Sequence, residues 1–136
     1  MMKLLSLRLR PRMVQAHKAL IDDGFMTGCI TNNTPGSTAK DWVEADARGT
    51  VAEVFARFDA VIESATAGMR KPEPRIYQHM CERLHVEPEA CVFLDDLGVN
   101  LKPAKALGMH TIKVPVTHWE EALVALETLI GRPVIR

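Results

Sequence analysis

Several polar residues of complementary chemistry directly follow apolar runs in this 136-residue sequence. Thr31 and Asn32 follow the run FMTGCI, Asp95 and Asp96 follow CVFL, and Lys71 lies in the loop GMRKPEP. Carboxylates hold a hard cation such as Mg²⁺, an ammonium group offsets phosphate charge, and a hydroxyl with backbone amides orients the remaining phosphate oxygens. The residue types therefore predict a site for a phosphoryl group and Mg²⁺, provided that the fold brings them together.

Each of these residues also has an ordinary structural interpretation. An Asp pair after a strand commonly forms a helix cap or a turn, because Asp accepts hydrogen bonds from exposed helix amides. Thr31 alone is typical of a strand end, and a lysine in a proline-rich loop is typically a solvated surface group. The combination of the groups is more informative than any one of them.

The order of the expected elements decides whether these residues can meet. Helical periodicity predicts helices, and short apolar runs that end in polar residues predict strands. The expected helices are 13–21, two short ones within 38–57, 76–84, 101–107 and 118–130, and the expected strands are 25–30, 59–63, 91–94 and 111–114. This alternation predicts an α/β fold with a parallel sheet covered by helices on both faces. Ligands of such sheets bind outside the carboxyl ends of the strands, which is where these polar residues fall.

The composition fits one domain with one hydrophobic core, because 47% of the residues are apolar. Seventeen basic and seventeen acidic residues cancel, so no general charge attracts nucleic acid or anionic lipid. No apolar run approaches the ~20 residues of a membrane-spanning helix. The three cysteines form no CxxC pair and are expected as small buried residues in a reducing, cytoplasmic compartment. Binding must therefore come from a local site.

Two further groups of residues carry weaker signals. The five histidines lie on different expected elements without metal-ligand spacing, so we expect them on helix surfaces or strand edges. The first twelve residues contain four basic residues and no acid, which is faintly similar to a transit peptide. Their apolar part is too short and too interrupted for a secretory signal, so we favour a structural role for this segment.

The sequence from Gly68 to Val114, with LDDLGVN at its centre, resembles the haloacid dehalogenase superfamily of hydrolases. Within that superfamily it is similar to the phosphatase-type domains of soluble epoxide hydrolase and of acyl-CoA dehydrogenase family member ten. With ITNN at 30–33 and the helix before it, the similarity covers about residues 11–136. The resemblance implies a Rossmann-like core that cleaves small-molecule phosphate monoesters with Mg²⁺.

The resemblance also implies a role for each matching residue. In the family, the residues that match Thr31 and Asn32 contact the transferred phosphoryl group, and the matching lysine neutralises the nucleophile and the phosphate. The matching acids hold Mg²⁺ directly or through water, and an asparagine supports the same loop. The residues carried over are Thr31, Asn32, Lys71 and Asn100 for phosphate, Asp95 and Asp96 for metal, and Lys71 and Asp95 for catalysis.

One motif of the family is absent from these residues. The family's nucleophile is the first Asp of a DxDx[TV] motif, and no D-x-D occurs in the 136 residues. The helical cap that follows this motif and selects the substrate is also missing.

We expect 1–136 to be a single core domain, the carboxyl-terminal part of a longer hydrolase, with 1–10 atypical. A degenerate member is the alternative. Whether this chain is an enzyme stays open: weak or absent phosphatase activity is expected, or a non-catalytic phosphate- and metal-binding or interaction module. A true dehalogenase is a weaker third possibility.

The missing motif also affects the expected sheet. In the family, the strand that carries the motif lies between the strand that ends at Thr31 and the strand that ends at Asp95. An open gap there would cost about 1–3 kcal/mol for each buried backbone group without a partner. We expect KLLSLRL at 3–9 to fill the gap. The alternatives are direct pairing of the two neighbouring strands, or a strand from another copy, which would give a homo-oligomer.

Overall fold

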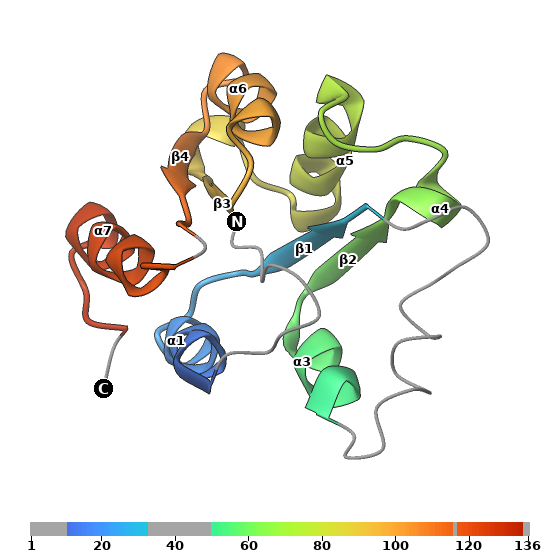
Figure 1. The fold of residues 1–136 in the computed structure, drawn as a ribbon. Coiled ribbons are helices and arrows are strands. Elements are labelled where there is room, and N and C mark those ends of the chain that lie inside the picture. The colour runs from blue at the N-terminus through green and yellow to red at the C-terminus, as the bar shows by residue number, and fades with distance from the viewer. Residues whose placement is uncertain (1–10, 33–49, 116, 135–136) are drawn as a thin grey trace.

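A computed structural model describes residues 11–32, 50–115 and 117–134 (Figure 1), and within these ranges helices and parallel strands alternate, which confirms the predicted α/β class. The strands are β1 (Gly28–Thr31), β2 (Ala60–Glu63), β3 (Val92–Asp95) and β4 (His110–Lys113). The helices are α1 (Pro11–Asp22), α3 (Thr50–Arg57), α4 (Ser64–Ala67), α5 (Pro74–Leu84), α6 (Gly98–Ala106) and α7 (Glu120–Ile130), with a 3-10 turn η1 (Pro88–Ala90). No helix in these ranges is both long and apolar enough to cross a membrane.

The described strands form two parallel pairs. β1 pairs with β2, with Thr31 opposite Glu63, and β3 pairs with β4, with Asp95 opposite Lys113. Among the residues that the structure describes, β1 does not pair with β3, so the alternative of direct pairing between these strands is not seen. The expectation that residues 3–9 fill the position between them falls outside the described residues and stays a prediction.

Helices pack across both strand pairs and hold them together. On one side, α1 and α7 enclose an apolar cluster with β3 and β4, including Leu94 and Ile112. On the other side, the buried stripe of α5 packs against Ile30 of β1, Ile62 of β2 and Phe93 of β3 in one cluster. Because this second cluster contains residues of three strands, it fixes the β1–β2 pair relative to β3.

The buried stripe of α5 has the spacing that the sequence predicts for a helix with one apolar face. Its members are Ile76, Tyr77, Met80, Cys81 and Leu84. The helix begins with a proline at its first position, where the missing amide costs no hydrogen bond, and ends at Leu84, followed by the C-cap residue His85 with φ 55°. Because α5 begins at Pro74, it directly follows the loop that carries Lys71.

Several predicted boundaries differ from the structure. β1 begins at Gly28 instead of residue 25, because Phe25 and Met26 are 37% and 47% exposed and precede the paired segment. The short α4 and η1 were not predicted, because neither has an apolar stripe. α6 begins at Gly98, and β4 spans His110–Lys113. Of the two short helices predicted within 38–57, the described part contains α3, and 38–49 lie outside the described residues.

His17 is buried, so the expectation of a surface position is wrong for this histidine. Its Nε2 lies 2.9 Å from Thr27 Oγ1, and its ring stacks on Phe58 at a centroid distance of 4.1 Å. Burial lowers the pKa of His17 to about 4, to which the Arg57 charge adds, against an opposing effect of Asp59. The neutral ring therefore connects α1 to the segment that enters β1. The three cysteines are buried as predicted, and none forms a disulfide.

Candidate functional site

Lys71 and Asp95 form a buried ion pair. Lys71 lies in the loop between α4 and α5, Asp95 is the last residue of β3, and Nζ is 2.9 Å from Oδ2. The residues are 3% and 0% exposed, so neither charge has much contact with water. Removing both charges from water is costly unless further hydrogen bonds satisfy them. Asn100 Nδ2 donates to Asp95 Oδ2 at 3.2 Å, and Leu97 N donates to Asp95 Oδ1 at 3.1 Å.

Asn32 links the end of β1 to the same pair. Its Oδ1 accepts a hydrogen bond from Lys71 N at 3.0 Å, and its Nδ2 donates to Lys71 O at 3.1 Å. Lys71 therefore contacts the carboxyl end of β1 through its backbone and the carboxyl end of β3 through its side chain. Four residues predicted from separate parts of the sequence meet in one connected network: Asn32, Lys71, Asp95 and Asn100.

Thr31 and Asp96 are each next in sequence to a member of this network. Thr31 is the last residue of β1, directly before Asn32, and is 8% exposed. Asp96 follows Asp95 and is half-buried. Their positions agree with the predicted location at strand ends, and their roles as phosphate and metal ligands stay predictions.

Tyr77 belongs to the network, although the sequence indicated only a core residue at this position. Its hydroxyl donates to Asn100 O at 2.6 Å, and its ring meets Phe93 edge-on at a centroid distance of 5.2 Å. Burial, followed by the charge of Asp95, raises the pKa of Tyr77, which keeps the hydroxyl protonated as a donor. The signal for this role is general: a buried tyrosine usually needs a partner for its hydroxyl.

Of the cap and turn interpretations of the Asp pair, the structure shows a turn for Asp95, because the N-cap of α6 is Leu97 and the amide that Asp95 bonds precedes the helix. Its Oδ1 accepts from Leu97 N just before α6, while Oδ2 faces Lys71 and Asn100. The same carboxylate thus orients the start of α6 and holds the buried ammonium. Leu97 and Val99 nearby are exposed apolar residues.

The donor chemistry for a metal ion consists of two neighbouring carboxylates, Asp95 and Asp96. Within residues 11–32, 50–115 and 117–134, no three His, Cys, Asp or Glu side chains gather around a common point. Mg²⁺ does not require three, because proteins commonly hold it with one or two carboxylates while water and phosphate oxygens complete its shell. Two carboxylates are therefore a sufficient kind of donor set for Mg²⁺, and metal binding by Asp95 and Asp96 stays a prediction.

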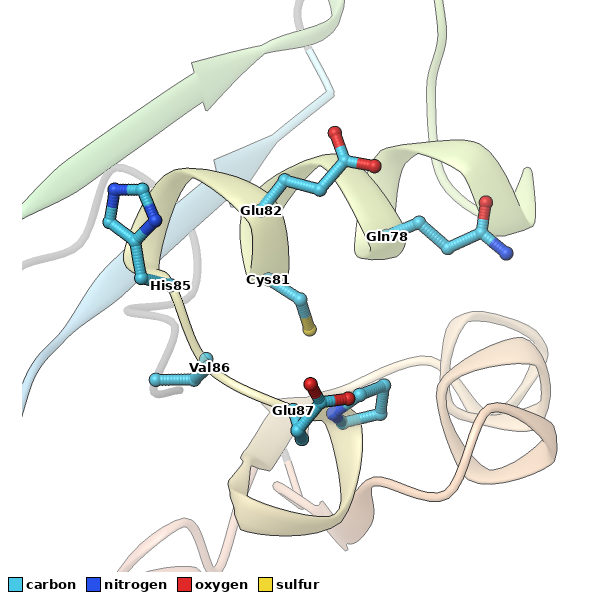
Figure 2. Close-up of a pocket in the computed structure, with 7 residues that line it drawn as sticks. Gln78, Cys81, Glu82, His85, Val86 and Glu87 are labelled. Carbon is cyan, nitrogen blue, oxygen red and sulfur yellow. The ribbon is translucent and has the colours of Figure 1, made fainter.

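A separate cavity lies between α5 and the segment at residues 86–88 (Figure 2). Its volume is about 560 Å³, and it is lined by Gln78, Cys81, Glu82, His85, Val86, Glu87 and Pro88. The Cys81 sulfur points toward Glu87 and lies 3.9 Å from the sulfur of Cys91. Burial and the neighbouring Cys91 raise the pKa of Cys81 to about 12, so its thiol stays protonated. This cavity shares no residue with the network around Lys71.

The chain matches known proteins over most of its length. Residues 2–108 match the family model described as haloacid dehalogenase-like hydrolase. The chain is 41% identical to mouse (Mus musculus) acyl-CoA dehydrogenase family member 10 over 123 residues, and 43% identical to rat (Rattus norvegicus) bifunctional epoxide hydrolase 2 over 119 residues. These alignments cover 90% and 88% of this chain but only 11% and 21% of the two relatives.

A solved structure also shares the fold. A crystal structure of an uncharacterized protein from Corynebacterium glutamicum superimposes with a TM-score of 0.76 and 21% identity. The superposition covers 96% of this chain and 93% of that one. This likeness confirms the predicted fold. The match to the family model over residues 2–108 confirms the predicted family.

Proposed function

Because the chain belongs to the haloacid dehalogenase-like hydrolases, we propose that its polar network binds the phosphoryl group of a small-molecule phosphate ester together with Mg²⁺. The observation that carries this proposal is the connection from Asn32 through Lys71 to Asp95, which brings the ends of β1 and β3 together. In this proposal the phosphate site consists of Thr31, Asn32, Lys71 and Asn100, and the metal ligands are Asp95 and Asp96.

The charges of the site support a shared requirement for phosphate and metal. Lys71, Asp95 and Asp96 together carry a formal charge of about −1 when all three are ionised, which disfavours a phosphate dianion. A bound Mg²⁺ would reverse the sign of this charge and so attract the anion. The Lys71 ammonium has three N–H groups, and its contact with Asp95 leaves donors for phosphate oxygens. Binding of phosphate and binding of Mg²⁺ should therefore strengthen each other.

The chemistry of hydrolysis is a separate part of the proposal. No D-x-D occurs in these 136 residues, so the attacking carboxylate expected from the family is not among them. We propose hydrolysis of phosphate monoesters for a full-length form and weak or absent turnover for this chain alone. The same absence favours the second candidate function, a non-catalytic phosphate- and metal-binding module.

Similarity to these two relatives does not assign their complete activities to this chain. The chain spans about a tenth and about a fifth of the lengths of the two relatives named above. We propose a small phosphate ester as the substrate class, and a reducing compartment such as the cytoplasm as the location. The three buried cysteines without a disulfide support this location.

The test combines a binding readout with a turnover readout. Inorganic phosphate with Mg²⁺ should raise the melting temperature by several degrees, because a ligand that binds the folded state stabilises it. Asp96→Asn should abolish this effect, and Asp22→Asn, at the exposed end of α1, is the matched control. No shift with phosphate and Mg²⁺ would contradict the binding proposal. Robust Mg²⁺-dependent hydrolysis of p-nitrophenyl phosphate, lost in Asp96→Ala, would contradict weak turnover.

A further inference from the structure

The side chain of Asn32 makes two hydrogen bonds to the backbone of a single residue. Oδ1 accepts from Lys71 N at 3.0 Å, and Nδ2 donates to Lys71 O at 3.1 Å. A carboxamide has the same donor and acceptor as a peptide group, so the pair resembles the exchange of hydrogen bonds between neighbouring strands. Asn32 thus extends the pairing of β1 beyond Thr31 to a loop 39 residues later in the sequence.

The peptide that Asn32 holds belongs to the residue whose side chain reaches Asp95. Lys71 Nζ lies 2.9 Å from Asp95 Oδ2, and the ammonium is almost fully buried. Within the loop, Glu73 N donates to Arg70 O at 2.8 Å, which is a local contact, whereas the two hydrogen bonds of Asn32 reach the loop from the end of β1. The position of the Lys71 Cα relative to β1 therefore depends directly on Asn32.

We propose that Asn32 is a positioning residue, which acts on the phosphate site through the Lys71 peptide and not by a side-chain contact with the phosphoryl group. The Oδ1 atom is directed at Lys71 N, and Nδ2 is directed at Lys71 O, so the carboxamide is already engaged. The expected effect of Asn32 on phosphate affinity rests on the proposed phosphate-binding function. The expected effect of Asn32 on the position of the Lys71 backbone does not depend on any ligand.

Two substitutions separate positioning from direct contact. Asn32→Ala removes both hydrogen bonds to Lys71. Asn32→Asp keeps an oxygen that accepts from Lys71 N and loses the donor to Lys71 O. Gln15→Ala, which truncates an exposed amide on α1, is the control. All variants keep the Lys71 and Asp95 side chains.

The first measurement is the hydrogen-exchange rate of the Lys71 amide, followed by NMR in the folded protein without ligand. Asn32→Ala should accelerate it at least about tenfold, and Asn32→Asp should stay much closer to the unsubstituted protein. The control should not change it. Unchanged Lys71 exchange in Asn32→Ala overturns the proposal. If Asn32→Ala does not fold, Asn32→Asp decides: retained protection supports the proposal, and lost protection overturns it.

The second measurement is the affinity for inorganic phosphate in the presence of Mg²⁺, by calorimetry well below the melting temperature. Asn32→Ala should weaken it roughly tenfold or more, in parallel with the faster Lys71 exchange. Weaker affinity with unchanged Lys71 exchange would show direct contact and overturn positioning. If the unsubstituted protein binds no phosphate while Lys71 exchange accelerates in Asn32→Ala, the proposed function fails and the placement of Lys71 by Asn32 stands.

Discussion

The Lys71 ammonium and the Asp95 carboxylate meet at 2.9 Å, although one lies in the loop before α5 and the other at the end of β3. Asn32 holds the backbone of the same lysine from the end of β1. One residue thus joins two strand pairs that do not pair with each other within the described residues. The structural stability of this region and its proposed ligand binding therefore depend on the same side chains.

The buried pair should be costly to break from one side only. Lys71→Met leaves Asp95 buried without its cation and should lower the free energy of unfolding by about 3–5 kcal/mol. Lys71→Met combined with Asp95→Asn should cost less than the sum of the two single substitutions, because the uncompensated charge is gone. Urea denaturation at pH 7 measures this. A loss below about 1 kcal/mol for Lys71→Met would show that the pair is not buried as described.

His17 should make stability depend on pH. Its pKa is lowered from 6.5 to about 4 in the folded state, so the unfolded chain binds the extra proton between these values. The contribution of the neutral His17 to the free energy of unfolding is fully present above pH 6.5. It is lost as the pH falls toward 4, by about 3 kcal/mol at most. Denaturation at pH 7.5 and pH 4.5 should show a smaller loss for His17→Gln than for the unsubstituted protein.

The matched control for this effect is His110→Gln, because His110 is exposed on β4. It should leave the pH dependence unchanged. An equal loss of stability between pH 7.5 and pH 4.5 in His17→Gln and in the unsubstituted protein would contradict the role given to His17.

The thiol of Cys81 should react slowly, although it faces the cavity in Figure 2. Its pKa is raised from 9.0 to about 12, which lowers the thiolate fraction at neutral pH about a thousandfold. Alkylation by iodoacetamide, followed by mass spectrometry, should therefore be slow in the folded protein and rapid in urea. Rapid labelling of folded Cys81 at pH 7 would contradict the burial of this thiol.

Tyr77→Phe isolates the hydrogen bond between α5 and α6. It removes the donor 2.6 Å from Asn100 O and keeps the ring against Phe93. The expected loss of stability is about 1 kcal/mol. Hydrogen exchange of the amides near Asn100 should accelerate, because the first turn of α6 loses the hydrogen bond from the Tyr77 hydroxyl. A variant with unchanged stability and unchanged exchange would mean that this contact does not support the site.

The strand ends could be predicted from the sequence because a buried strand is an apolar run that stops at polar residues. This pattern located Thr31 and Asp95 at the ends of β1 and β3. The start of β1 could not be predicted in this way, since Phe25 is apolar but lies outside the paired segment. The position of His17 could have been predicted from its spacing with Met13 and Leu20, but its polarity argued for the surface.

The connections within the site were harder to predict than its residues. Asn32 bonds to the backbone of Lys71, and a backbone partner carries no residue type that a sequence pattern can register. The same is true of Leu97 N on Asp95 and of Tyr77 on Asn100 O. Residue types at strand ends predicted most members of the site, and the resemblance added Asn100. Their arrangement depends on the packing of α5 against three strands, which the sequence does not show directly.

The most direct test of the proposed site is a two-dimensional ¹H–¹⁵N NMR titration of the ¹⁵N-labelled protein with inorganic phosphate in the presence of Mg²⁺. We predict saturable shifts for the amides of residues 31, 32, 71 and 95–100, and no saturable shifts for those of the cavity residues 78, 81, 82 and 85–87. Shifts confined to these cavity residues, or no saturable shift anywhere, would contradict a phosphate site at Lys71 and Asp95.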